Sequence, residues 1–343
     1  MKNYELSVLR LYDPEEEYAQ LFTEFLKKRE GLPWEVHTYT SVEEIVKETR
    51  QNRTAVLVVA ETAFSEELAK LQAGCTVILN ESGVVKWPEF RNVNKYQKAE
   101  NILQELLEAY LEFAEITFPR LTETGKAKLV GIYSPVRRCL QTSFALTMSQ
   151  MLAEEYTTLY LNFEHYAGIT GLLPDMQTRD LADLLYFLNA QGQEFYLRME
   201  TLIRKRGQLD YVPPVKAGQN LLAVTSQEWQ RLLQKIDESG KYQYIVLDLS
   251  ESMQGLFDIM KKCMRIFTLT KNDRAAACKM LQYEQLLGMC QYEEILEKTS
   301  RIILPRFDRI PEEPEQYTRG ALADYVRSIL AEERRAGTWN IQS

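Results

Sequence analysis

The sequence predicts an α/β protein with two doubly wound domains, and three observations support this prediction. Residues 128–164 run as an apolar strand, a loop, an amphipathic helix and a second strand, which is a βαβ unit and implies a parallel sheet. Residues 5–112 also alternate short apolar strands with helical segments. Between these regions, residues 113–127 carry Pro119 and Gly125, which interrupt both patterns as a linker does.

The length of the chain agrees with this division. For a chain of 343 residues, two domains are the expected number. We place the first domain at residues 1–115, a linker at 116–127, the second domain at 128–335 and a tail at 336–343.

The composition, 45% hydrophobic and 26% charged, is ordinary for a globular protein. No apolar run approaches the ~20 residues that span a membrane. The first residues lack the form of a signal peptide, so we expect a cytoplasmic protein. The net charge of −8 argues against nucleic-acid binding by the whole surface, although it is compatible with a local basic patch. Five cysteines without metal spacing and two distant histidines do not predict a zinc-type site.

Four apolar segments of the first half are expected to be strands: residues 5–12, 34–39, 55–60 and 76–79. The first helix starts at Asp13 and Pro14 with glutamates in its first turn, where negative charge suits the helix dipole. Ser41 and Glu44 form a capping box for the second helix, and residues 99–112 form the last one.

Three polar residues of the first half lie near strand ends. Asp13 follows the first strand, Glu61 follows the third, and Lys95 precedes the last helix. With this order of elements, the first half resembles a response-regulator receiver, whose phosphotransfer needs an aspartate after the third strand and an acid pair after the first. Because Glu61 replaces that aspartate, the resemblance implies a pseudo-receiver without aspartyl phosphorylation. The alternative for Lys95 is a solvated loop residue.

The second half is expected to place residues 129–133, 159–163, 245–248 and 265–269 as neighbouring strands of a mainly parallel sheet. Short strands are also expected at 210–214 and 301–304. Helices are expected at residues 142–154, 178–188, 195–206, 229–236, 275–287 and 320–333. Ligands bind such sheets where a strand ends and a helix begins, so the loop at 134–141 is the first place to look for function.

Polar residues follow each of these central strands. The loop that ends in Gln141 leads into Thr142 at the helix start, Asn162 and Glu164 end the second strand, and Asp248 ends an apolar strand in the Walker B pattern. Over residues 126–335 this arrangement resembles MinD/ParA-type P-loop ATPases, including the CpaE-like branch that carries an N-terminal receiver-like domain. The resemblance implies ATP and Mg²⁺ as cofactors.

The resemblance assigns a role to each position. Thr142 and Asp248 match the magnesium site, while Asn162, Glu164 and Asp248 are the candidate catalytic residues. Gln141 takes the place of the phosphate-binding lysine, and Val136 falls where the family has its signature lysine. Arg137, Arg138 and Leu140 replace glycines of the loop, and residues 165–173 correspond to a glycine-containing switch region.

A phosphate-cradling loop needs residues with φ > 0, which cost a non-glycine residue roughly 1–2 kcal/mol each. The three glycine replacements therefore predict a loop of different shape. Loss of the lysine removes a charged contact of roughly 1.5–3 kcal/mol, but arginine guanidiniums and free helix-start N–H groups also suit phosphate. If a nucleotide or another anion binds to this protein, we expect it at Arg137, Arg138, Cys139, Leu140, Gln141, Thr142 and Ser143. We do not expect efficient ATP hydrolysis there.

These patterns predict a regulatory or localisation protein of the MinD/ParA/CpaE type that binds ATP weakly or not at all. We expect protein partners, including a homodimer, and a pseudo-ATPase rather than an enzyme. One alternative is an active ATPase in which arginines replace the P-loop lysine. Another is a DNA-associated partition-type protein, which the acidic net charge disfavours.

Overall fold

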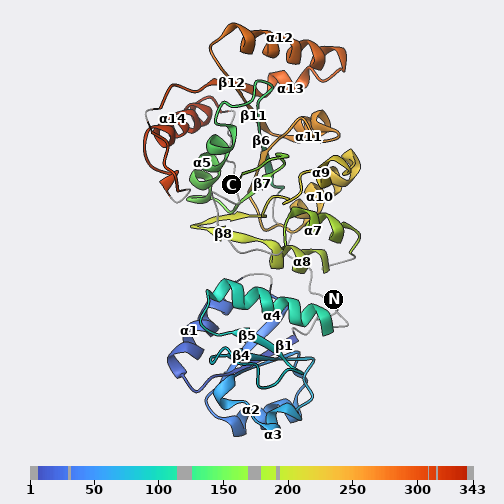
Figure 1. The fold of residues 1–343 in the computed structure, drawn as a ribbon, viewed down its shortest axis with the longest axis vertical. Helices are drawn as coiled ribbons and strands as arrows, with labels where there is room; N and C mark the ends of the chain where they lie inside the picture. The colour runs from blue at the N-terminus through green and yellow to red at the C-terminus, as the bar shows by residue number, and fades with distance from the viewer. Residues whose placement is uncertain are drawn as a thin grey trace. The chain divides into compact units, whose positions relative to one another are not determined.

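The computed structural model describes residues 7–29, 32–113, 126–168, 179–190, 194–307, 309–313 and 316–337. The chain forms two compact units, one made of residues 1–121 with 190–201 and the other of residues 122–189 with 202–343. Each unit contains its own β-sheet with helices on its faces (Figure 1). Most of the predicted linker and tail, and the end of the predicted switch region, lie outside the described residues.

The first unit contains, in its described residues, a five-stranded parallel sheet with the order β2-β1-β3-β4-β5. This is one of the two common orders of doubly wound sheets. Its strands are β1 (Ser7–Tyr12), β2 (Trp34–Tyr39), β3 (Val56–Ala60), β4 (Cys75–Asn80) and β5 (Arg91–Asn94). Its helices include α1 (Glu16–Lys27), α2 (Val42–Gln51), α3 (Glu66–Ala69) and α4 (Ala99–Phe113).

The central strand β3 explains why the first unit has helices on both faces of its sheet. Side chains of a strand alternate between faces. Val56 and Val58 therefore pack in the cluster that includes α1 and α4, while Leu57 and Val59 pack in the cluster that includes α2. All five residues of β3 are buried, as the continuous apolar run predicts.

The sheet of the second unit has the order β12-β11-β6-β10-β7-β9-β8 in its described residues. Its strands are β6 (Lys128–Tyr133), β7 (Thr158–Asn162), β8 (Arg204–Arg206), β9 (Leu209–Tyr211), β10 (Tyr244–Asp248), β11 (Arg265–Thr270) and β12 (Thr299–Ile303). Strands β11, β6, β10 and β7 are consecutive and parallel, so the predicted neighbours are confirmed.

One predicted element of this half is wrong. The helix expected over residues 195–206 ends at Leu202, and Arg204–Arg206 form strand β8, which pairs antiparallel with β9. Gly207, with φ 60°, begins the two-residue turn between them. The basic side chains that resemble a helix end are thus on an edge strand.

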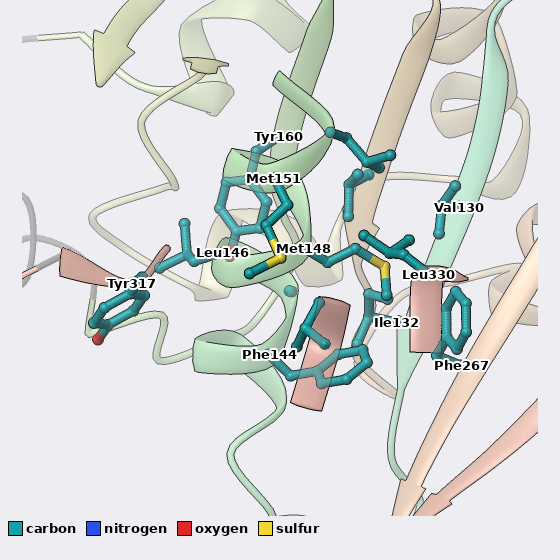
Figure 2. Packing of buried hydrophobic residues seen from close by; sticks show 14 of the residues in the cluster. Val130, Ile132, Phe144, Leu146, Met148, Met151, Tyr160, Phe267, Tyr317 and Leu330 are labelled. Carbon is teal, nitrogen blue, oxygen red and sulfur yellow. The ribbon is translucent and has the colours of Figure 1, made fainter. Parts of the chain in front are cut away.

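The helices of the second half are α5 (Gln141–Ala153), α7 (Leu181–Tyr186), α8 (Glu194–Leu202), α9 (Gln219–Leu222), α10 (Ser226–Glu238), α11 (Leu256–Lys262), α12 (Arg274–Met289), α13 (Glu294–Glu297) and α14 (Ala321–Arg335). Helix α5 is buried from Phe144 to Ala153, between the sheet and α14. Figure 2 shows Phe144 and Met148 packed near Ile132 of β6 and Phe267 of β11. This packing fixes the start of α5 relative to the strand ends.

None of the helices in the described ranges is long and apolar enough to cross a membrane.

Candidate functional site

The carboxyl ends of β6, β10 and β7 bring the predicted loop and acids of the second unit together. Asp248 is in register with Ile132 of β6 and with Asn162 of β7. The loop after β6 then leads into α5, whose first residue, Gln141, lies in front of β10 and forms a hydrogen bond with Asp248. The adjacency of these segments follows from the parallel order of the three strands.

The loop before α5 keeps a left-handed backbone at three positions without any glycine. Arg137, Arg138 and Leu140 have φ values of 63°, 50° and 60°. The expectation of a different loop shape is therefore wrong at these positions. Such conformations cost roughly 1–2 kcal/mol each for residues with a Cβ, and they persist where surrounding contacts determine them.

Ser134 supplies the contacts that hold the loop from inside. Its buried hydroxyl oxygen accepts hydrogen bonds from the backbone N–H groups of Val136 (3.2 Å) and Arg137 (3.1 Å). The Cys139 thiol also donates to this oxygen, at 2.9 Å. Burial raises the pKa of Cys139, so this thiol is a structural group of the loop rather than a reactive one.

Gln141, the first residue of α5, turns its side chain back onto the strand ends. Its Nε2 donates to Asp248 Oδ1 at 2.6 Å and to the carbonyl oxygen of Leu249 at 2.8 Å. A third, longer contact of 3.4 Å joins Nε2 to Glu164 Oε1. A neutral amide therefore occupies the space between two carboxylates.

Asp248 is fully buried, and both of its oxygens are engaged. Besides the bond from Gln141 to Oδ1, Oδ2 accepts from the Tyr160 hydroxyl and from Asn162 Nδ2, each at 2.9 Å. Burial raises the pKa of Asp248, while hydrogen bonds from Gln141, Tyr160, Thr142 and Asn162 act in the opposite direction. Tyr160 was not among the predicted residues. Its position two residues before Asn162, on the same face of β7, is the signal that would have indicated it.

Glu164 is the second carboxylate of this site. Its pKa is raised to about 7, first by burial and then by the charge of Asp248, while Arg137 lowers it. Among the described residues, the side chain between the two acids is the neutral amide of Gln141, which supplies no balancing charge. The result is a half-buried acid that titrates near neutral pH.

The two loop arginines are exposed and differ in their contacts. Arg137 pairs with Glu251, beyond the end of β10. Arg138 has no ion pair or hydrogen bond within the described part of the chain, and neither guanidinium pairs there with Glu164 or Asp248.

A cavity of about 770 Å³ opens in front of this loop. Ligand pockets are commonly about 300–1,000 Å³. The cavity is lined by the whole predicted binding segment, Arg137 to Ser143, together with Glu164, His165, Tyr166, Leu222, Ser250 and Ser252. Hydroxyl groups and arginines thus line the side next to the start of α5.

The first unit has a separate polar cluster around Lys95. This lysine is 1% exposed, so the alternative of a solvated side chain is wrong. Its Nζ lies 2.9 Å from Asp13 Oδ2, 2.9 Å from Glu81 Oε1 and 3.2 Å from Glu15 Oε1. Burial acts to lower the pKa of Lys95, but the hydrogen bonds that its ammonium donates to these carboxylates outweigh burial and raise that pKa.

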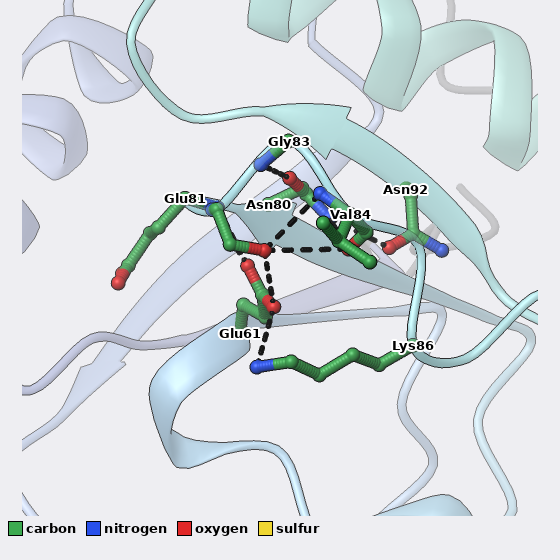
Figure 3. A network of polar contacts seen from close by, with 8 residues as sticks. Glu61, Asn80, Glu81, Gly83, Val84, Lys86 and Asn92 are labelled. Atoms are coloured by element: carbon green, nitrogen blue, oxygen red, sulfur yellow. Dashed lines mark hydrogen bonds and ion pairs between the residues drawn. The ribbon is translucent and has the colours of Figure 1, made fainter.

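Glu61, predicted together with Asp13 and Lys95 as a pseudo-receiver residue, is outside the Lys95 cluster. It accepts hydrogen bonds from the N–H groups of Glu81 and Ser82, each at 2.9 Å, and pairs with Lys86 at 2.9 Å (Figure 3). The bond with Lys86 is the main cause that lowers the pKa of Glu61 to about 2. Glu81, which sequence reasoning missed, follows β4, and a search for acids after every strand would have found it.

No family model matches the chain, and no curated protein sequence matches it. Among solved structures, similar folds are found in ParA- and MinD-type ATPases at low identity. A plasmid partition protein from Borrelia burgdorferi B31, bound to AMPPNP, is 13% identical with a TM-score of 0.44, and the match covers 61% of this chain and all of that one. A ParA family ATPase from Chlorobium tepidum is 15% identical with a TM-score of 0.42, covering 51% of this chain and 73% of that one.

The MinD cell division protein of Aquifex aeolicus is also 15% identical, with a TM-score of 0.40, and the match covers 52% of this chain and 68% of that one. At these identities and scores, the likeness carries no conclusion about function. A proposal about function must therefore rest on the chemistry of the two polar clusters.

Proposed function

We propose that this chain is a regulatory or localisation protein of the MinD/ParA/CpaE type, with a nucleotide site that binds a phosphate group without hydrolysing ATP. The observation that carries this proposal is the side chain of Gln141, which bonds Asp248 and Leu249 in the lysine position. A P-loop enzyme needs a lysine at that position to hold the transferred phosphoryl group.

Anion binding at residues 137–143 has support from the loop itself. Phe144 N donates to Leu140 O, so the N–H groups of Gln141, Thr142 and Ser143 precede the hydrogen-bond ladder of α5. The φ values above zero at Arg138 and Leu140 are of the kind found in anion-binding loops, while the N–H group of Arg137 is bonded to Ser134. Arg138 is exposed at the cavity and supplies a positive charge.

The first unit, in this proposal, is a pseudo-receiver over residues 1–115. Lys95 engages Asp13, and Glu61 is held by Lys86 and Ser82, so neither acid is free for magnesium or phosphate. Incubation with acetyl phosphate and Mg²⁺, read by mass spectrometry, should give no adduct on Asp13 or Glu61. A stoichiometric acid-labile adduct on either residue would refute this part.

Protein partners, a homodimer and a cytoplasmic location belong to the same proposal, with the second domain at residues 128–335. The active-ATPase alternative requires Arg137 and Arg138 to replace the lysine. The DNA-associated alternative requires a local basic patch on a chain whose net charge is −8.

Calorimetric titration with ATP and Mg²⁺, with turnover measured on the same sample, tests the proposal. We expect weak binding or none for this nucleotide, and no turnover. Turnover near the ~1 s⁻¹ that marks the lower end of ordinary enzymes would establish the active ATPase instead. Loss of that turnover in the double variant Arg137→Ala, Arg138→Ala would assign it to the loop.

A further inference from the structure

We infer that Gln141 replaces a divalent cation at the end of β10, so that the loop takes its phosphate group without a metal. This inference rests on the proposed function of the loop as an anion site. Its ligand is a single phosphate group, inorganic phosphate or a phosphate monoester, rather than a magnesium-bound triphosphate.

The first observation concerns the contacts of Asp248, the acid that would bind magnesium according to the resemblance. Its two oxygens accept hydrogen bonds from Gln141 Nε2, Tyr160 OH and Asn162 Nδ2 at 2.6 to 2.9 Å, and the Thr142 side chain adds a further one. It is 0% exposed. A cation could reach this carboxylate only by displacing donors that already satisfy it.

The second step is the orientation of the Gln141 amide. Its nitrogen bonds both the Asp248 carboxylate and the Leu249 carbonyl oxygen, and two acceptors on one NH₂ group fix which end of the amide faces the site. The NH₂ nitrogen of a neutral amide is not a metal ligand. Mg²⁺ requires oxygen ligands in a nearly octahedral arrangement at about 2.0–2.1 Å, and the oxygens on this side, Asp248 Oδ1, the Leu249 carbonyl oxygen and Glu164 Oε1, are already contacted by the amide.

The third step concerns charge. Glu164 and Asp248 both contact the Gln141 amide, and no cationic side chain of the described residues lies between them. A triphosphate would bring several negative charges toward two carboxylates without the metal that normally neutralises them. A single phosphate group adds much less repulsion and can be met by Arg138 and the N–H groups of the loop.

Calorimetric titrations with inorganic phosphate and with AMP, each in EDTA and in MgCl₂, test the ligand class. We expect at least one of them to bind, with affinities in the two buffers that agree within about threefold, and MgATP to bind more weakly. A gain of about tenfold or more on adding magnesium, or tighter binding of MgATP, would overturn the inference. If none of the three binds in either buffer, the proposed anion site itself fails.

Electron paramagnetic resonance of Mn²⁺ tests the cation site without any phosphate ligand. The parent and the variant Asp248→Asn should bind the same amount of Mn²⁺, because Asp248 holds no cation in the parent. The variant Gln141→Ala exposes the Asp248 carboxylate and should gain a bound Mn²⁺. The double variant Gln141→Ala, Asp248→Asn should lose this Mn²⁺. Gln282→Ala, an exposed glutamine on α12, is the matched control and should behave as the parent.

Two results would contradict the role of Gln141. One is Mn²⁺ bound to the parent and lost in Asp248→Asn. The other is a folded Gln141→Ala variant, judged by circular dichroism, that still takes no Mn²⁺. The measurement on the parent decides the matter even if the variant fails to fold.

Discussion

The two units of this protein each gather acids at the carboxyl end of a parallel sheet, and they neutralise them by different chemistry. In the first unit, the buried ammonium of Lys95 lies within 3.2 Å of oxygens of Asp13, Glu15 and Glu81. In the second unit, the amide of Gln141 lies between Asp248 and Glu164. An ammonium supplies charge and hydrogen bonds, whereas an amide supplies only the hydrogen bonds.

This difference explains the opposite behaviour of the titratable groups. Three carboxylates around Lys95 raise the pKa of that lysine, so the lysine stays charged and paired at neutral pH. Around Gln141, burial and Asp248 raise the pKa of Glu164 to about 7. The two units therefore share the arrangement of acids at the end of a sheet. Of these two clusters, the first has a cationic side chain, Lys95, at its centre, and the second has a neutral amide.

The largest expected effect concerns the cation of the first cluster. Lys95→Ala leaves three acids without their partner and should destabilise the first unit by about 3–5 kcal/mol, measured by denaturant unfolding. Lys98→Ala, a nearby exposed lysine, should change stability within about 0.5 kcal/mol. Equal stability of the two variants would show that Lys95 does not neutralise the cluster.

The same variant sharpens the comparison through metal binding. Oxygens of Asp13, Glu15 and Glu81 lie within 4.8 Å of one another. Added Ca²⁺ or Mg²⁺ should therefore raise the melting temperature of Lys95→Ala by occupying the lysine position, and should leave the parent unchanged. An equal rise in parent and variant would place the metal elsewhere.

The next effect is on anion binding by the loop. Replacing Arg137 and Arg138 with alanine should weaken phosphate binding by roughly 1.5–3 kcal/mol for each arginine that contacts the anion, measured by calorimetry. Because Arg137 also pairs with the exposed Glu251, its share should be the smaller. Stability should change within about 0.5 kcal/mol, and unchanged phosphate binding would remove both arginines from the site.

A smaller effect is the pH dependence caused by Glu164. Since its pKa rises from 4.5 to about 7 on folding, the folded state binds the proton more tightly. The contribution of Glu164 to the free energy of unfolding is therefore largest below pH 4.5. It decreases as the pH rises to about 7 and is constant above that pH.

Glu164→Gln should abolish that loss and stabilise the protein above pH 7 by about 1–2 kcal/mol, a figure reduced for the partial exposure of the side chain. Thermal unfolding across this range measures it. Glu154→Gln, an exposed residue at the end of α5, is the control. A parent whose stability shows no decline in this window would contradict the raised pKa.

The fold was predictable where strands are continuously apolar. Continuous apolar runs predict buried strands at residues 129–133, 245–248 and 265–269, and their order implies a parallel sheet. Strand β5 was missed because, in Arg91–Asn94, only Val93 is apolar and buried. Strand β8 was misread because a basic segment that suits a helix end also suits an edge strand.

The site was predictable in its residues but not in its contacts. Gln141 and Asp248 stand at positions that the topology brings together, yet the sequence cannot show that the amide bonds the carboxylate. The left-handed loop was missed for a physical reason. Local propensity opposes φ > 0 at Arg137 and Leu140, while specific hydrogen bonds within the loop, such as those to the Ser134 hydroxyl, maintain it.

The most direct test of the amide-for-cation account is the titration of Glu164 itself. Carbon NMR of labelled glutamate, with the signal assigned through Glu164→Gln, should give a pKa of about 7 in the parent. Gln141→Lys places a positive charge between the two acids and should lower the pKa of Glu164 toward its ordinary value of 4.5. An ordinary pKa in the parent, or the same raised pKa in both proteins, would contradict the account.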